Sequence, residues 1–185
     1  MESAVFDMKN LLCSSTNMLK SMLQYSDKPF GECNRIAQQE FTESDQFAKD
    51  TVYSWIRQVG GKVLNTDEAY YSHDFIAELN GKIVKVEVER KKSGWAEDEF
   101  KWSTHDVPYR KSTSCANLFF QINQRGTAMM MCPMSVVKSS PIKRKNTYLT
   151  KNEPFYAVPT SNVRYYFLED GVWYEDEITS DASSS

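Results

Sequence analysis

The sequence lacks the features of secreted and membrane proteins. Its 185 residues contain four cysteines without a CxxC pair, and they contain no N-x-S/T sequon. We therefore expect buried free thiols rather than a disulfide framework or a zinc site. No segment approaches the roughly 18 consecutive apolar residues of a membrane span, and charged residues interrupt the N-terminus where a signal peptide needs an apolar core. These absences predict a soluble, cytoplasmic protein without a membrane partner.

Several catalytic motifs are also missing. The chain has no GxxxxGK[ST], no GxGxxG and no GxSxG, which argues against a P-loop NTPase, a dinucleotide enzyme and an α/β-hydrolase. Histidine is scarce, and we expect structural or surface roles rather than catalytic ones for His73 and His105.

Charge is unevenly distributed along the chain, although the net charge is only −3. Residues 165–185 hold six acidic and no basic side chains, so residues 1–164 sum to +3, which is −3 plus 6. Residues 85–145 hold twelve Lys and Arg against six Asp and Glu. A basic middle with an acidic end is compatible with polyanion binding, and an ordinary solvated surface is the alternative.

Apolar spacing predicts two helices in the first third of the chain. We expect one amphipathic helix over 4–24 and a second that begins between Glu32 and Ser44, with Ser44 as its N-cap and Gly60-Gly61 as its stop. The second helix carries an apolar stripe of Phe47, Ala48, Val52, Trp55, Ile56 and Val59.

Short strands are predicted from Lys62 onward. The expected strands are 62–65, 73–79, 82–88, 117–123, 127–133 and 162–168, and the basic stretches 105–112 and 140–147 are expected as loops or nucleic-acid contacts. A helix that leads into a mostly antiparallel sheet indicates the α/β (α+β) class. We expect one domain over 1–174 and a disordered, acidic, Ser-rich tail over 175–185.

Asn80-Gly81 is the strongest short signal for a β-hairpin with a type I′ turn. Counting outward from this turn places Ala77 opposite Val84 and Asp74 opposite Glu87. The apolar face of the hairpin then consists of Phe75, Ala77, Leu79, Val84, Val86 and Val88. The other face brings carboxylates opposite each other, and such carboxylates repel. A divalent cation such as Mg²⁺ would compensate; a solvated face of alternating charges is the alternative.

The segment HDFIAELNGKIVKVEVE, with a helix ahead of it, resembles the core of the PD-(D/E)XK nuclease superfamily. Its hairpin is most similar to that of archaeal-type Holliday junction resolvases. The resemblance covers roughly residues 40–92 and combines spacing, turn, hydrophobic pattern and preceding helix. It implies a restriction-endonuclease-like mixed sheet flanked by helices, and a Mg²⁺- or Mn²⁺-dependent nuclease that hydrolyses DNA phosphodiester bonds.

By this resemblance, Asp74 and Glu87 are metal ligands, and an upstream acid on the helix, Glu40 or else Glu43, completes the site. In the family, a lysine two residues after the second acid helps to position or activate water. Glu89 occupies that position here, and it would instead accept a proton from water or bind a second ion.

Lys91 follows Glu89 on the same strand face, and it is the candidate base or phosphate contact. In a second alignment, Glu89-Arg90-Lys91 forms the E-x-K triplet, which restores the lysine but moves the acidic partner out of register with Asp74. The carboxylates suit one metal ion or two.

DNA is the expected partner of the basic side chains near this segment. The candidates for DNA contact are Arg90, Lys92, Arg110 and Lys111. Cutting both strands of DNA usually needs two sites, so a homodimer is expected by analogy. Two other functions remain open: a catalytically impaired nuclease-fold protein that binds nucleic acid or a protein partner, and an unrelated α+β interaction protein.

Overall fold

The computed structural model describes residues 30–65, 73–147 and 150–176. The chain divides into two compact units, Met1–Glu43 and Ser44–Ser185. In the first helix of the described residues, side chains are described from Thr42 onward. The helix expected over 4–24 therefore lies outside the described residues, as do the side chain of Glu40 and those of Cys13 and Cys33.

The long helix α3 runs from Phe30 to Gln58. Ser44 lies inside it, so the predicted N-cap is wrong: residues 32–43 are mostly good helix formers, and nothing interrupts the helix before Ser44. The core of the apolar stripe is confirmed, because Ala48, Val52, Trp55 and Ile56 are buried.

Two expected members of the stripe are exposed instead. Val59 is 44% exposed because it follows the last helical residue, and Phe47 is 38% exposed at the flank of the stripe. The predicted stop is confirmed: Gly60 has a φ of 76°, and the Gly61 N–H donates to the Ile56 carbonyl over 2.8 Å.

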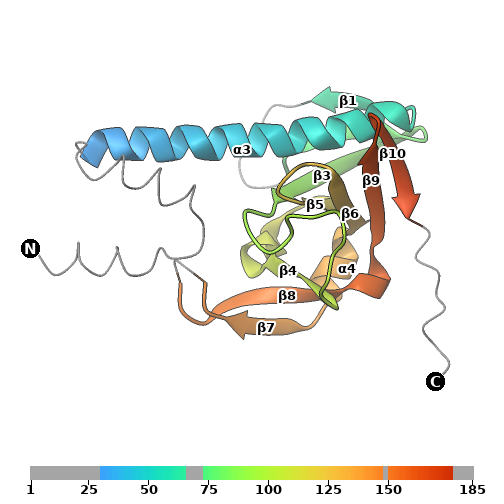
Figure 1. The fold of residues 1–185 in the computed structure, drawn as a ribbon. Coiled ribbons are helices and arrows are strands. Elements are labelled where there is room, and N and C mark those ends of the chain that lie inside the picture. Colours follow the sequence, from blue (N-terminus) through green and yellow to red (C-terminus); the bar gives the residue numbers. More distant parts are fainter. Residues whose placement is uncertain (1–29, 66–72, 148–149, 177–185) are drawn as a thin grey trace, which may run out of the picture. The chain divides into compact units, whose positions relative to one another are not determined.

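Among the described residues, ten strands follow α3 and form two sheets (Figure 1). The seven-stranded sheet has the order β1-β2-β3-β5-β6-β9-β10, with strands at Lys62–Asn65, Phe75–Leu79, Lys82–Arg90, Leu118–Ile122, Ala128–Pro133, Arg164–Glu169 and Val172–Asp176. All neighbouring strands in it are antiparallel except β3 and β5, which pair in parallel. The protein is thus of the mixed α+β class.

The three-stranded sheet has the order β4-β8-β7, with strands at Thr104–Pro108, Glu153–Pro159 and Ile142–Lys145. The short helices are η1 (Tyr109–Thr113), α4 (Met134–Ser139) and η2 (Thr160–Asn162). The expectation of loops is therefore wrong for 105–112 and for half of 140–147: β4 and η1 cover the first stretch, and β7 covers only 142–145 of the second. Their polar composition hides two strands that both pair with β8, and for β4 this partner lies far along the chain.

The predicted hairpin and its register are confirmed. Asn80 and Gly81 have φ values of 50° and 72°, and Phe75 pairs with Val86 and Ala77 with Val84. The turns at 124–126 and 169–171 also connect antiparallel neighbours, β5 to β6 and β9 to β10.

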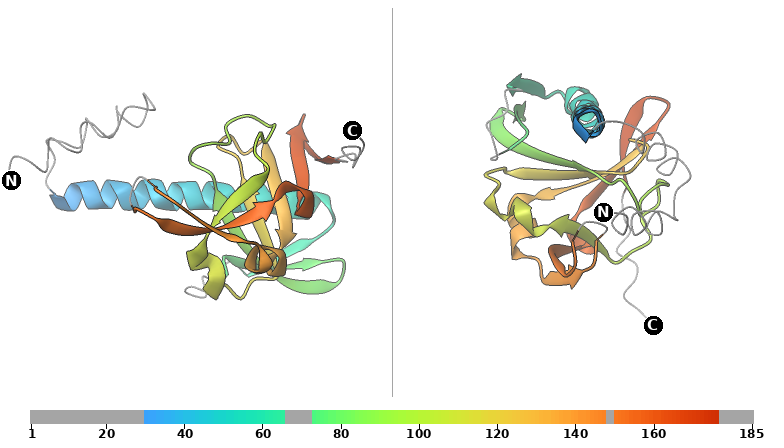
Figure 2. Two further views of the ribbon diagram at one scale, coloured as in Figure 1. Left: turned by 90° about the horizontal axis from the view of Figure 1, so that it is seen from below. Right: turned by 90° about the vertical axis from the view of Figure 1, so that its left-hand side faces the viewer.

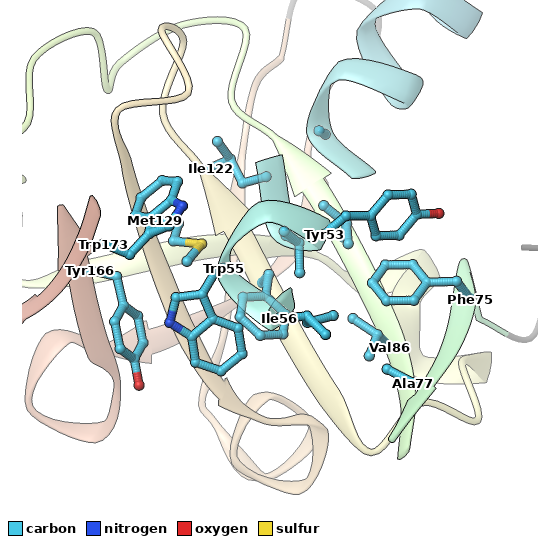
Figure 3. Close-up of a cluster of buried hydrophobic side chains, with 14 residues drawn as sticks. Tyr53, Trp55, Ile56, Phe75, Ala77, Val86, Ile122, Met129, Tyr166 and Trp173 are labelled. Atoms are coloured by element: carbon cyan, nitrogen blue, oxygen red, sulfur yellow. The ribbon is translucent and has the colours of Figure 1, made fainter. Parts of the chain in front are cut away.

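Each face of the large sheet carries a hydrophobic core. On one face, Trp55 and Ile56 of α3 pack among Val86, Phe120 and Met129 (Figure 3). On the other face, Phe119 and Met130 pack with residues of the small sheet and of α4. Figure 2 shows the part of α3 after Ser44 and the small sheet on opposite sides of the large sheet. Odd-numbered residues of β3, such as Glu87, therefore point toward the small sheet.

Two further observations concern cysteines and membranes. Cys132 is buried as expected, whereas Cys115 is exposed.

In the stretches that the structure describes, no helix combines the length and the apolar character needed to span a bilayer.

Candidate functional site

Asp74 and Glu87 bring two carboxylates together at the open end of the β2–β3 hairpin. Asp74 immediately precedes β2; its N–H donates to the Val86 carbonyl over 2.8 Å, and its Oδ2 accepts the Val88 N–H over 2.6 Å. These bonds hold Asp74 against β3. Burial, and then the negative charge of Glu87, raise the pKa of Asp74 to about 6.

Glu87 is buried, and both of its carboxylate oxygens have partners. Lys111 of η1 donates to Oε1, and Ser114 Oγ donates to Oε2 over 2.8 Å. The charge of Lys111 also acts on Asp74, whose pKa it lowers against the larger effects of burial and Glu87. Both partners of Glu87 come from the connection between β3 and β5, so this connection covers the carboxylate pair from the side of the small sheet.

Glu89 lies next along the same face of β3, beside Gln121 of β5. Gln121 Nε2 donates to Glu89 Oε1 over 3.4 Å, and Lys91 Nζ lies 3.8 Å from the same oxygen. The other oxygen, Oε2, is buried and accepts no hydrogen bond from any described residue. Glu89 therefore has acceptor capacity that a proton, a water molecule or a cation can use.

Lys91 is a largely buried lysine that joins Glu89 to β4. Its Nζ donates to the Asp106 carbonyl over 2.6 Å. Burial lowers the pKa of Lys91, and the nearby charge of Glu89 opposes this effect.

Asp106 extends the charged network to the edge of the small sheet. Lys143 Nζ lies 2.5 Å from Asp106 Oδ1, and Lys145 contacts Oδ2. Burial alone would raise the pKa of Asp106, but the hydrogen bonds from the two lysines lower it. Sequence reasoning missed these residues as part of the site; the alternation of Lys143 and Lys145 in IKRK, typical of one strand face, was the available signal.

A buried histidine network orients Gln121 beneath the site. His105 Nδ1 lies 2.9 Å from Gln121 Oε1, and its Nε2 lies 2.6 Å from the Tyr165 hydroxyl. Burial lowers the pKa of His105 to about 4, so the ring is neutral at pH 7. His105 has the structural role expected for it, and its bond to the Gln121 oxygen directs the Gln121 amide nitrogen toward Glu89.

The four side chains predicted to contact DNA lie in different places. Arg90 points to the α3 side of the sheet, where its guanidinium lies 4.2 Å from the Phe47 ring centre and bonds to the Gln124 carbonyl. Lys92 and Arg110 are exposed, and Lys111 is held on Glu87. The structure thus brings Asp74, Glu87 and Lys111 together and separates Arg90 from them.

The donor chemistry of the carboxylate pair fits a hard divalent cation. In residues 42–64, 73–147 and 150–176, no three His, Cys, Asp or Glu side chains form a ready-made metal site. Mg²⁺, however, is often bound by one or two carboxylates, with water and substrate phosphate as the other ligands. Asp74 and Glu87 supply two such carboxylates, and Glu89 adds a buried oxygen that has no hydrogen-bond partner among the described residues.

Comparison with protein-family models, with curated proteins and with solved structures gives no match to this chain.

Proposed function

We propose that the protein is a Mg²⁺- or Mn²⁺-dependent nuclease that hydrolyses DNA phosphodiester bonds. The observation that carries this proposal is the coupled carboxylate pair of Asp74 and Glu87, with Lys111 bound to it. The fold is also in keeping with the PD-(D/E)XK resemblance. A helix precedes a mixed sheet, and the hairpin lies next to the single parallel pair among the described strands, β3 and β5.

Asp74 and Glu87 would hold the metal ion. When bound, such an ion lowers the pKa of a water molecule and polarises a phosphate. The protein itself would supply a proton acceptor. Glu89 Oε2 has no partner among the described residues and can take a proton from the attacking water.

Positive charge is available although Glu89 stands in the usual lysine position. Lys91, which directly follows β3, lies beside Glu89, and Lys111 of η1 pairs with Glu87. Arg110 and Lys92 are exposed and would contact the phosphates of DNA, and Tyr109, next to Arg110 in the sequence, is 41% exposed. A homodimer that cuts both strands, and a cytoplasmic location, complete the proposal.

A second candidate function is a nuclease-fold protein that binds nucleic acid without cutting it. The pairing of Lys111 with Glu87 favours it, because the chain itself already neutralises one carboxylate of the pair. The two candidates differ in what they require of a metal ion: DNA binding through lysines needs none, whereas hydrolysis at this site does.

Incubation with Mn²⁺ and supercoiled, linear, single-stranded or branched DNA tests the proposal. The wild type should cut at least one of these forms, and Asp74→Asn should reduce cutting by more than the roughly 10–100-fold typical of changes outside the first ligand shell. Glu78→Gln is the matched control: Glu78 lies on the same hairpin, opposite Ile83, and its loss should leave the rate unchanged. DNA binding without cutting by the wild type would favour the second candidate.

A further inference from the structure

Lys111 occupies the place where the proposed function requires a cation. Its Nζ bonds to Glu87 Oε1, and its charge acts on Asp74 as well. The side chains of Lys111 and Glu87 are only 17% and 8% exposed, so solvent screens their interaction weakly. A metal ion held by the two carboxylates would need an oxygen that Lys111 now covers.

Stabilisation of the fold does not by itself explain why Lys111 is paired with Glu87. Buried ion pairs lose most of their Coulomb attraction to desolvation. Asp74 also adds a second negative charge beside Glu87, and one lysine cannot balance two carboxylates. The cluster of Asp74, Glu87 and Lys111 carries a net charge of about −1 when both acids are ionised, a deficit that a divalent cation in place of the lysine removes.

We propose that Lys111 is a placeholder cation that exchanges with the metal ion. This inference rests on the proposed function. In the metal-free protein, Lys111 and Ser114 hold the Glu87 carboxylate in place through its two oxygens. When the metal binds, the like charge of the ion drives the Lys111 amino group off Oε1. The amino group, on a flexible stem in η1, then lies next to the carboxylate pair and can contact the scissile phosphate.

The exchange predicts opposite changes in metal affinity and in rate for Lys111→Met. Loss of the competing ammonium should tighten Mn²⁺ binding about tenfold, which corresponds to about 1.4 kcal/mol. Loss of the phosphate contact should lower the cleavage rate at saturating Mn²⁺. A merely structural lysine would not give this combination, because disorder at Glu87 would weaken metal binding.

Titration calorimetry with Mn²⁺ on the full chain measures the affinity. Lys138→Met is the matched control, because Lys138 also lies beside the site, with its Nζ donating to the Ser114 carbonyl over 2.7 Å, but bonds to no carboxylate there. Its affinity should stay within about twofold of wild type. Lys111→Arg keeps the charge on Glu87 and should also bind Mn²⁺ like the wild type, which guards against a folding defect in Lys111→Met.

Each outcome has a distinct meaning. If the wild type binds Mn²⁺ and Glu87→Ala does not, the proposed site stands; unchanged or weaker binding by Lys111→Met then overturns the exchange alone. If Lys138→Met tightens binding as much as Lys111→Met, a general charge effect replaces the exchange. If neither the wild type nor Lys111→Met binds Mn²⁺, both the proposed function and the exchange fail.

Discussion

Ser114 is a buried residue whose hydroxyl accepts the Ala116 N–H over 3.2 Å. Its hydroxyl donates to Glu87 Oε2 in a buried environment. Ser114→Ala would leave that oxygen without its donor, so the free energy of unfolding should fall by about 1–3 kcal/mol. Urea denaturation measures it. Ser139→Ala removes an exposed hydroxyl bond to the Val136 carbonyl and should cost less than about 0.5 kcal/mol; equal losses would contradict the assigned role of Ser114.

His105 makes the stability of the fold depend on pH. Its pKa is about 4 in the folded protein and 6.5 in the unfolded chain, so the unfolded state binds the proton more readily. The stabilisation is therefore complete above pH 6.5 and is lost as the pH falls toward 4. The full loss is roughly 3 kcal/mol.

The measurement compares urea unfolding of the wild type and His105→Gln at pH 7.5 and pH 4.5. The wild type should lose more free energy of unfolding between these two pH values than the variant does. Parallel losses in the two proteins would show that other groups, and not His105, control the acid sensitivity.

At the scale of elements, the end of α3 depends on two glycines in different ways. Gly60 has a φ of 76° with nothing within 4 Å of an added Cβ, so Gly60→Ala should cost only the strain of a left-handed backbone, about 1–2 kcal/mol. A Cβ on Gly61 would lie 2.6 Å from Leu79 Cδ2 and 2.7 Å from the Glu78 carbonyl oxygen.

Gly61→Ala should therefore be the more damaging substitution, at about 3 kcal/mol or more, because backbone atoms of β2 cannot move away. Thermal denaturation of the two variants gives the order directly. A larger loss for Gly60→Ala would mean that α3 does not pack against the hairpin as closely as described.

The hairpin could be predicted from the sequence because its signals are local. Asn80-Gly81 sets the turn, and the turn sets which residues pair, so the positions of Asp74 and Glu87 follow from counting. The partners of Glu87 could not be predicted in this way. Lys111 reaches Glu87 from η1, and no local pattern in the sequence shows that η1 packs against β3.

Similar reasons explain the other differences between sequence and structure. The sequence predicts that the helix begins between Glu32 and Ser44, which is too late, because Ser44 has the chemistry of an N-cap whereas the residues before it form helix equally well. The sequence predicts loops or nucleic-acid contacts for the stretches of β4 and β7, because the pairing of Asp106 in β4 with Lys143 in β7 joins residues that are far apart along the chain.

At the scale of the whole molecule, residues 165–185 and residues 85–145 carry charges of opposite sign. Glu175 and Asp176 belong to β10, where Glu175 pairs with Arg164, and the remaining acidic residues, within 177–185, lie outside the described residues. If this segment competes with DNA for the basic surface, removal of 177–185 should tighten DNA binding a few-fold at low salt and have little effect at high salt. Fluorescence anisotropy measures both affinities, and a neutral tail of equal length is the control. Unchanged affinity at low salt would rule out the competition.

A Mn²⁺-soaked crystal tests most directly whether Asp74 and Glu87 form a metal centre. The expected result is an anomalous difference peak within roughly 2.5 Å of a carboxylate oxygen from each of the two residues, with the Lys111 amino group moved off Glu87 Oε1. No peak at this pair, with Lys111 still bonded to Glu87 at saturating Mn²⁺, would contradict the proposed metal site and the nuclease function that depends on it.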